Sequence, residues 1–380
     1  MKIANIFAGR IQHISIISII CIIAISYGLI FYLQNITEQE VKKSVFDQEI
    51  NRQTESAKAI SEHISSDLNL VMTMLYGLAN SVYLQEGDFS SNKAQNLVKE
   101  NYDNFSGIIN RLFILDNDDI VTINLSPRRS EIFVGADFSF RNWVKETREN
   151  LVPIFSNGFE RQGIYRIFIT YPIINRTTDE YIGMIGTSIP TVEFFSHYGN
   201  IHDINSQFLV AFDKNATLLA VGANKDLIGR NFFGEVAQKF INYNEILNNS
   251  TRKLLVGNPD YAVYDYGLGE RLTTGYPIFI NNEPKYFLQI ITPTEQIYSQ
   301  VEDVLFVQRI KMFSLLAGAG AAAIAVLIIL LIKWRVILRK EVKRRTKELE
   351  ESYDEVKQYL NTVLAELEQN KPSKVNKINK

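Results

Sequence analysis

Cysteine, histidine and proline are all scarce in this sequence of 380 residues. It contains one cysteine, Cys21, four histidines and nine prolines. A chain with one cysteine cannot form an internal disulfide, so an extracellular part would depend on packing alone for its stability. No Ser/His/Asp or Cys/His set stands out, and His197 and His202 lack the spacing of metal ligands on a helix. We therefore expect no catalytic residue, no metal, no cofactor and no enzyme activity.

Net charge is also nearly absent, at −2, but it is unevenly distributed. Residues 333–380 carry a net charge of +5, residues 1–33 carry +2, and the remainder is acidic, with a net −9. Basic ends around an acidic middle indicate a membrane topology and argue against a nucleic-acid partner.

Two stretches of twenty residues lack charge altogether: ISIISIICIIAISYGLIFYL at 14–33 and FSLLAGAGAAAIAVLIILLI at 313–332. Each would be about 30 Å long as a helix, which is enough to cross the hydrocarbon core of a bilayer. A cleavable signal peptide is a weaker explanation of 14–33, because the run is too long and no small-x-small cleavage site follows it. We predict two transmembrane helices.

The orientation follows from the basic residues beside these stretches. Lys2 and Arg10 precede the first, and KWRVILRKEVKRR follows the second. Positive charge is retained in the cytoplasm. We expect a two-pass protein of the cell membrane, with residues 1–13 and the C-terminal part in the cytoplasm and residues 34–312 extracellular or periplasmic.

The outer part contains an internal repeat. RLFILDNDDIVTINL (111–125) and FLVAFDKNATLLAVG (208–222) both predict a β-hairpin with an Asp before its polar turn. VGADF follows the first and IGRNF the second. Farther on, TYPIINRTTDEYIGMIGTSIPTVEF (170–194) and GYPIFINNEPKYFLQIITPTEQI (275–297) share Tyr-Pro-Ile, two strands and a Pro-Thr helix start. Four landmarks in the same order predict two copies of one α/β module.

A long helix precedes the repeat, over about 36–84. Its apolar residues recur every three or four positions, which predicts one stripe against which both modules would pack. The stripe comprises Ala57, Ile60, Ile64, Leu68, Val71, Leu75, Leu78 and Val82.

These features together resemble the double Cache (dCache) family, the extracellular tandem PAS-like sensors of transmembrane receptors. The resemblance covers about 36–300 and depends on the long helix, LFILDNDD, GADFSFRNWV, YPI, IGMIGTSI and YPIFINNEPKYFLQIITP. It implies an α/β (α+β) fold with a long helix at 34–99, a membrane-distal module at 100–195 that holds a ligand, and a membrane-proximal module at 196–294 that relays the signal.

The resemblance also suggests a binding site. Arg141 and Trp143 match the Arg-x-Trp core of amino-acid-binding members, whereas Ser188 stands where those members carry an Asp that pairs with the ligand's amine. A guanidinium can bind a carboxylate bidentately, and an indole can cover a flat ligand. We therefore expect Arg141, Trp143, Ser188 and Asp137 to form the ligand site, and a small organic anion to bind there more than a free amino acid.

A structural role for the same residues remains an alternative. Arg141 could pair with Asp137 and Trp143 could simply pack. The second copy has Glu235 and Ala237 at the matching positions. The second copy therefore indicates that the module does not need Arg and Trp at these positions in order to fold, and for this reason we favour a binding role.

The C-terminal part predicts a rod. TPTE (292–295) could begin a helix, with Thr292 as cap and Glu295 completing a capping box. An exit helix at 295–312 would then continue through the second span into residues 333–368. There the apolar residues step by four and three, which is typical of a dimeric coiled coil, although an amphipathic helix on the membrane is an alternative. Residues 369–380 are basic and predicted to be disordered.

The function that these expectations favour is a receptor. A ligand would bind the distal module, and the signal would pass through the second span to the coiled coil of a homodimer, and then to a separate cytoplasmic kinase or other signalling protein. Two alternatives remain: the chain is the sensor part of a histidine kinase without its output domain, or it is a membrane-anchored solute-binding protein with no signalling role.

Overall fold

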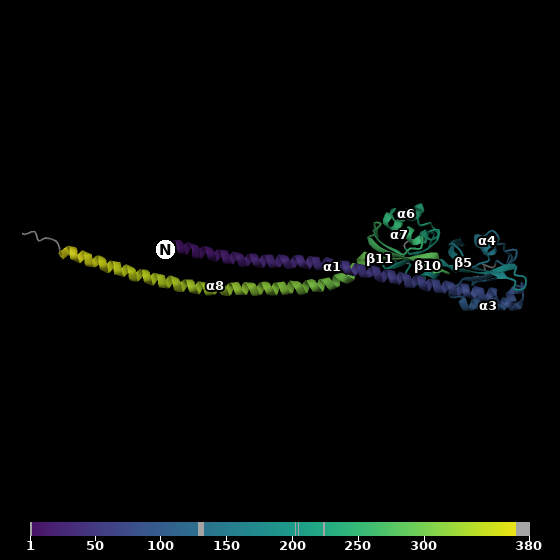
Figure 1. Ribbon diagram of the computed structural model, residues 1–380, viewed down its shortest axis with the longest axis horizontal. Helices are drawn as coiled ribbons and strands as arrows, with labels where there is room; N and C mark the ends of the chain where they lie inside the picture. The colour runs from purple at the N-terminus through teal and green to yellow at the C-terminus, as the bar shows by residue number, and fades with distance from the viewer. Residues whose placement is uncertain (1, 128–132, 202, 204, 223–224, 370–380) are drawn as a thin grey trace, which may run out of the picture. The chain divides into compact units, whose positions relative to one another are not determined.

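The computed structural model describes the protein except residues 1, 128–132, 202, 204, 223–224 and 370–380. It divides into two compact units, residues 30–304 and residues 1–29 with 305–380. The larger unit contains two antiparallel sheets and the shorter helices (Figure 1). A long helix, α1 (Lys2–Ala79), precedes the sheets, and another, α8 (Thr294–Gln369), follows them. This confirms the predicted mixed fold with a long helix at each end.

The first sheet has the strand order β2-β1-β6-β5-β3, and β4 also pairs with β5. Its elements are α2 (Val82–Gln85), α3 (Asn92–Phe105), β1 (Arg111–Asp116), β2 (Val121–Leu125), α4 (Asn142–Asn150), β3 (Ile154–Phe155), β4 (Phe159–Arg161), β5 (Ile164–Ile174), β6 (Tyr181–Pro190) and α5 (Thr191–Ser196).

The second sheet has the order β8-β7-β11-β10-β9, which repeats the path of the first. Its elements are β7 (Phe208–Asp213), β8 (Leu218–Val221), the 3₁₀ helix η2 (Lys225–Leu227), α6 (Glu235–Phe240), α7 (Glu245–Leu255), β9 (Asp260–Asp265), β10 (Glu270–Ile280) and β11 (Glu283–Pro293). The internal repeat read from the sequence is thus seen as two sheets of one topology.

The first hairpin of each sheet is closed in the same way. Asp116 Oδ1 accepts hydrogen bonds from the backbone N–H groups of Asp118 and Ile120. Asp213 Oδ1 accepts the equivalent pair two and four residues on. An Asp side chain that mimics a backbone acceptor in this way favours a tight turn, which explains why both apolar runs break after it.

The apolar stripe of α1 packs beneath both sheets. Leu68, Val71 and Leu75 are fully buried, in one continuous core with Ile114 of the first sheet and Leu288 of the second. Ser61 Oγ donates to the Pro277 carbonyl of the second sheet at 2.6 Å, whereas Tyr76 packs edge-on against Tyr171 of the first. The second sheet therefore contacts α1 nearer to its N-terminal end, as Figure 1 shows.

Two predicted helix limits were wrong. The stripe of α1 does not reach Val82, which is 55% exposed, because the helix ends at Ala79 and Ser81 caps α2, which buries Leu84 instead. At the other end, Thr292 and Pro293 belong to β11, and α8 begins at Thr294. Thr292 does not cap the helix: its hydroxyl donates to Gln53 Oε1 of α1 at 2.9 Å.

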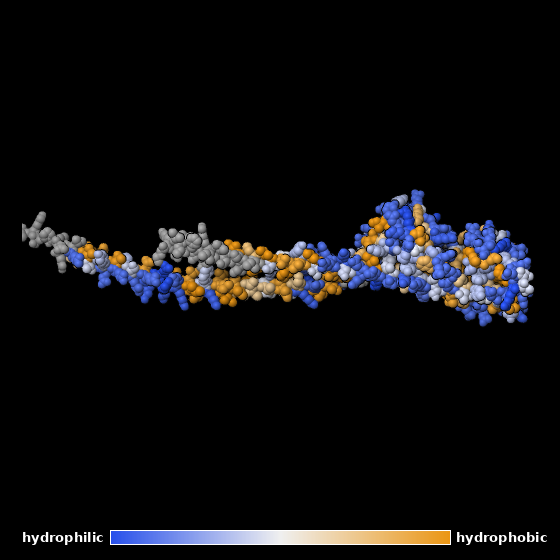
Figure 2. All heavy atoms as spheres, in the orientation of Figure 1, coloured by the Kyte–Doolittle hydropathy of each residue, from blue (hydrophilic) through white to orange (hydrophobic). Residues whose placement is uncertain are grey.

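The smaller unit consists of the N-terminal part of α1 and most of α8. Tyr27 donates a hydrogen bond to the Leu316 carbonyl, next to Gly320, where a Cβ would collide with the Tyr27 hydroxyl. Among the described side chains, one helix, at Thr294–Glu366, is long and apolar enough to span a membrane. Figure 2 shows its apolar segment followed by a hydrophilic one. Several side chains of residues 14–33 lie outside the description, so the first predicted span stays a prediction.

Candidate functional site

The first sheet has one face against α1 and the other against α4. On the α4 face, aromatic and aliphatic side chains form a separate core cluster, which we call the aromatic cluster. It comprises Phe113, Leu115, Val121, Phe138, Trp143, Val144, Phe168 and Met184, with Phe133 and Phe159 packed at its edge. All four predicted site residues lie in or beside this cluster or on the strand that faces it.

Trp143 is held inside the aromatic cluster. It lies in the first turn of α4 and is only 8% exposed. Its ring stacks on Phe168 with centroids 4.9 Å apart and an interplanar angle of 9°, and Phe113 lies 5.7 Å away. The indole thus packs, as the structural alternative expects, and it could touch a ligand only by an edge or after a local opening.

Arg141 occupies the N-cap position of α4, but its side chain makes no capping hydrogen bond. Its guanidinium lies 4.5 Å from the ring centre of Phe140 and 4.4 Å from that of Phe159. Burial among these rings lowers the pKa of Arg141 from its ordinary value, because the charged form is poorly solvated there. Aromatic faces attract a cation, but they do not satisfy its N–H donors.

Asp137 does not pair with Arg141 within the described residues. Its Oδ1 accepts a hydrogen bond from the backbone N–H of Ser139 at 2.8 Å. Hydrogen bonding to Ser139 lowers the pKa of the Asp137 carboxyl, so this group stays ionised in neutral solution. The predicted alternative of an Arg141–Asp137 ion pair was therefore wrong, because Asp137 caps its own turn.

Ser188 is fully buried in β6, and its Oγ has no hydrogen-bond partner among the described residues. It lies directly between Arg111 of β1 and Phe168 of β5 in the sheet register. Phe168 belongs to the aromatic cluster, and residues paired across a sheet share a face. The Ser188 hydroxyl therefore faces the same side as Trp143.

Three further arginines gather at this face, and the sequence reading missed them. Arg111 is 3% exposed and Arg166 is 2% exposed. The Arg111 and Arg161 guanidinium groups lie 4.7 and 3.8 Å from the ring centre of Phe133. The sequence did contain a signal for Arg166, because it is a charged residue within the apolar strand IYRIFITYPII.

The second sheet has other residue types at the three cross-strand positions that match Arg111, Ser188 and Phe168. Phe208 and Thr273 pair with Ile291 there, where the first sheet has Arg111, Phe168 and Ser188. Ala237 is buried at the position that matches Trp143. The cavity on this face holds about 50 Å³ and is lined almost wholly by apolar side chains. Both modules place arginines beside aromatic rings within the described residues. The first has more of them, whereas the second has the buried Arg271, 5.8 Å from the ring centre of Phe208, and Arg252, 5.3 Å from that of Phe233.

Comparison with known proteins points to sensing. Residues 72–189 match the family model described as HK/GC/Chemotaxis protein-like, sensor domain. No curated protein matches the chain. The predicted resemblance to a receptor sensor domain is therefore confirmed for residues 72–189.

Two solved structures share the fold with a TM-score of 0.51 and 11% identity. The extracellular domain of the putative histidine kinase mmHK1S-Z2 is matched over 67% of this chain and 99% of that domain. That of mmHK1S-Z3 is matched over 69% and 98%. The ligand-binding domain of the Pseudomonas aeruginosa amino acid chemoreceptor PctB, solved with L-Gln, is similar at 11% identity and a TM-score of 0.49, over 68% and 98%.

Proposed function

We propose that this protein is a transmembrane receptor that binds a small carboxylate-bearing molecule outside the cell, in the module of the first sheet. Arg141 would bind the carboxylate, Trp143 and the aromatic cluster would contact the body of the ligand, and Ser188 would complete the site. Asp137, whose carboxylate accepts a hydrogen bond from the Ser139 N–H, would hold the turn that precedes Arg141. The sensor-domain match over residues 72–189 supports the sensory role.

The surroundings of Arg141 carry the proposal. The guanidinium of Arg141 lies against two aromatic rings and has lost part of its hydration, and within the described residues no side-chain hydrogen bond or ion pair compensates for this. A ligand carboxylate would supply two charge-assisted hydrogen bonds in one plane, the geometry for which a guanidinium is suited. The rings of Phe140 and Phe159, which contact the Arg141 guanidinium, would then also lie beside the bound carboxylate.

Ser188 favours a polar ligand that is not cationic. A buried hydroxyl without a partner costs about 1–3 kcal/mol, and a ligand oxygen that reached it would recover part of that cost. The residue is neutral, so it offers no counter-charge to an ammonium group. We therefore favour an organic acid over an amino acid.

Transmission would use the helices at the two ends. The core of α1 continues from the first sheet to the second, and the second sheet ends directly in α8. Ligand binding that favours one arrangement of the two sheets on α1 would bias α8 by its differential affinity, and a coupling of about 1–3 kcal/mol would suffice. Two spans would carry α1 and α8 through the membrane.

Output would require a second copy. On the predicted cytoplasmic segment, Val342, Leu349, Tyr353, Val356 and Leu360 are between 58% and 70% exposed in the single chain. These residues follow the heptad spacing, so a parallel dimer would bury them. A separate cytoplasmic kinase is the partner that this arrangement suits.

A thermal-shift screen tests the binding step. Purified full-length protein in detergent is heated with small mono- and dicarboxylates, amino acids and amines, since a ligand that binds only the folded state raises the melting temperature. We expect a shift with one or more carboxylates, which Arg141→Ala abolishes. Arg176→Ala, which removes an exposed cation from the β5–β6 turn of the same sheet, is the matched control and keeps the shift. A carboxylate shift that survives Arg141→Ala would refute the site.

A further inference from the structure

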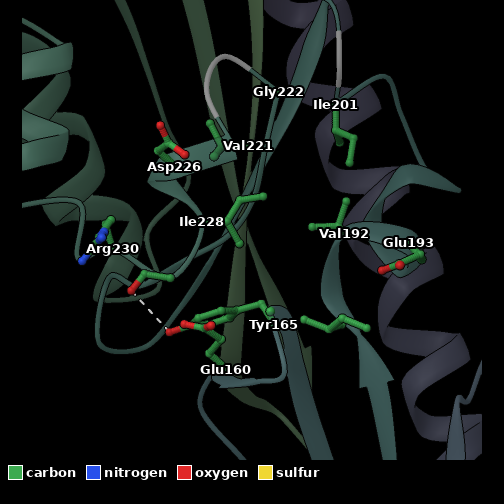
Figure 3. Close-up of a pocket in the computed structure, with 13 residues that line it drawn as sticks. Glu160, Tyr165, Val192, Glu193, Ile201, Val221, Gly222, Asp226, Ile228 and Arg230 are labelled. Carbon is green, nitrogen blue, oxygen red and sulfur yellow. Dashed lines mark hydrogen bonds between the residues drawn. The ribbon is translucent and has the colours of Figure 1, made fainter.

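A groove lies at the junction of the two sheets, and Arg141 is not among its lining residues. It has a volume of about 760 Å³, within the range of small-molecule sites, which often form where domains meet. The first module contributes Glu160, Tyr165, Val192 and Glu193, and the second contributes residues 221–222, 226 and 228–230. None of the four predicted site residues lines it. Figure 3 shows Val192 and Ile228 facing each other across it.

The walls of the groove combine apolar surface with negative charge. Its apolar side chains are Ile164, Val192, Ile201, Val221 and Ile228, and its charged ones are Glu160, Glu193, Asp226 and Arg230. Among the described residues that line the groove, carboxylates therefore outnumber guanidinium groups, and in Figure 3 the Arg230 guanidinium is turned away from Glu193. This is the reverse of the arginine-rich face of the first sheet.

We propose that this groove is a second ligand site, which takes a small organic cation: an amine with an apolar body. The ammonium would lie beside a carboxylate of the first module, Glu160 or Glu193, and its hydrocarbon part would cover Val192 and Ile228. Among the described residues, no group of three or more His, Cys, Asp or Glu side chains is placed to hold a metal ion, so a cation with hydrocarbon of its own fits the groove better than a bare metal.

The position of the groove gives such a ligand a means of regulation. Direct contacts already join the sheets around it: the Tyr165 hydroxyl donates to the Gly229 carbonyl at 3.3 Å, and Thr191 Oγ1 donates to the Leu219 carbonyl at 2.6 Å. Gly158 N–H also donates to Asp213 Oδ2 at 3.0 Å. The two walls of the groove belong to different modules. A ligand bound between them would therefore stabilise the spacing of the modules that fits the ligand, and would affect how a signal passes from the first module to the second.

Calorimetric titration of the full-length protein in detergent with phenethylamine tests the proposal. Phenylacetate has the same ring and chain length with the opposite charge, and phenethyl alcohol is the neutral match. We expect saturable binding of phenethylamine that is at least tenfold tighter than binding of the alcohol. The double variant Glu160→Gln/Glu193→Gln should weaken it by about tenfold or more, because both carboxylates are removed. Both side chains are exposed, so the variant should melt within a few degrees of the wild type.

Arg141→Ala separates this site from the one proposed above. It should leave phenethylamine binding unchanged, while the double glutamine variant should leave the carboxylate shift unchanged. Absence of saturable phenethylamine binding, equal binding of the alcohol, or binding that the double variant does not weaken would each overturn the second site. Loss of phenethylamine binding in Arg141→Ala would instead place the amine at the first sheet and would also contradict it.

Discussion

At the scale of single residues, the first sheet combines desolvated cations with aromatic rings. Arg141 lies against the rings of Phe140 and Phe159, and Arg111 and Arg161 both lie close to the ring of Phe133. Stacking keeps a guanidinium flat and in place, so less conformational freedom is lost when an anion binds. A lysine ammonium has neither the planar shape nor the paired donors.

Replacing Arg141 by lysine should therefore be costly although the charge is kept. We expect Arg141→Lys to weaken carboxylate binding by about 10–100-fold, since the bidentate contact and the stacking are both lost. Calorimetric titration with the carboxylate found in the screen measures this. Affinity within twofold of the wild type would mean that only the charge of Arg141 matters.

The sequence indicated part of this site. Arg141 and Trp143 stand in a recognisable short motif, and Ser188 follows from the strand register. Arg111 and Arg166 were missed because Arg111 begins an apolar strand and Arg166 interrupts one. The pattern of a strand alone does not show whether a charged side chain within it is buried in the protein interior. The burial of Trp143 was also not predictable, because its ring stacks on Phe168, a residue of β5 that is 25 positions away in the sequence.

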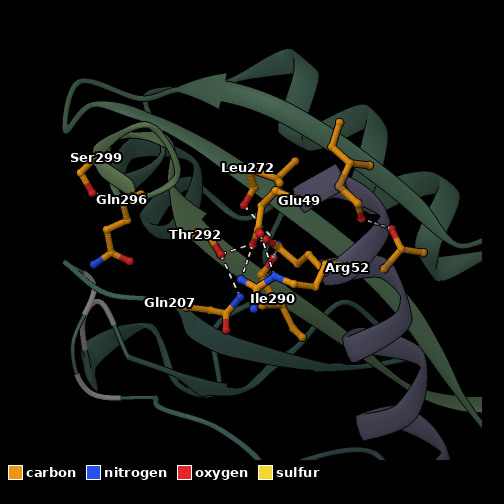
Figure 4. A network of polar contacts seen from close by, with 11 residues as sticks. Glu49, Arg52, Gln207, Leu272, Ile290, Thr292, Gln296 and Ser299 are labelled. Carbon is orange, nitrogen blue, oxygen red and sulfur yellow. Dashed lines mark hydrogen bonds and ion pairs between the residues drawn. The ribbon is translucent and has the colours of Figure 1, made fainter. Parts of the chain in front are cut away.

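At the scale of elements, a buried polar network joins α1 to the end of β11. Gln53 is 1% exposed, and its Nε2 donates to the Ile290 carbonyl at 2.6 Å. Its Oε1 accepts from Thr292, and Gln207 in turn donates to Thr292 at 3.0 Å. Figure 4 shows this network beside the Glu49–Arg52 pair. It lies one residue before Pro293, directly ahead of α8.

Removing the amide of Gln53 should loosen this junction. Gln53→Leu keeps the volume but leaves buried groups of Ile290 and Thr292 without partners, which should cost about 1–3 kcal/mol of unfolding free energy. Arg52→Ala, one residue away, removes an arginine whose side chain is 68% exposed, together with its ion pair to Glu49, and should cost at most about 1 kcal/mol. Urea unfolding compares the two, and equal losses would show that the network does not stabilise the junction.

Two glycines at matching positions offer a test of the contact between the modules. Gly135 and Gly229 both have positive φ, +86° and +81°, so alanine is strained at either site by about 1–2 kcal/mol. A Cβ at Gly135 meets open space, whereas one at Gly229 would collide with the ring of Tyr165. Gly229→Ala should therefore lose about 1–3 kcal/mol more unfolding free energy than Gly135→Ala.

Urea unfolding of the two alanine variants measures that difference. Gly229→Ala combined with Tyr165→Leu should lose less than the sum of the single changes, because the collision is relieved. Equal effects of the two alanines would mean that the Tyr165 ring can move aside, and that the junction is looser than the packing indicates.

The element boundaries show where sequence reading fails. The strands and hairpins were predictable because short apolar runs and the turn-forming Asp residues between them are local signals. The start of α8 was not, since TPTE is a good local helix start that the structure uses differently: Thr292 and Pro293 complete β11, and Thr292 bonds to Gln53, 239 positions away. Tertiary pairing overrode the local signal.

At the scale of the whole molecule, the account requires the two sheets to lie outside the cell and the tail of α8 inside. The charge asymmetry predicts this orientation. The sequence is well suited to a direct measurement because Cys21 is its sole cysteine.

Labelling of single cysteines by a membrane-impermeant maleimide in intact cells tests this central claim most directly. In a Cys21→Ser background, Lys99→Cys places a thiol on an exposed position of α3, and Glu351→Cys places one on the exposed tail of α8. The account predicts that the first is labelled in intact cells and the second only after permeabilisation. Labelling of the second but not the first in intact cells, or of both only after permeabilisation, would contradict an extracellular receptor.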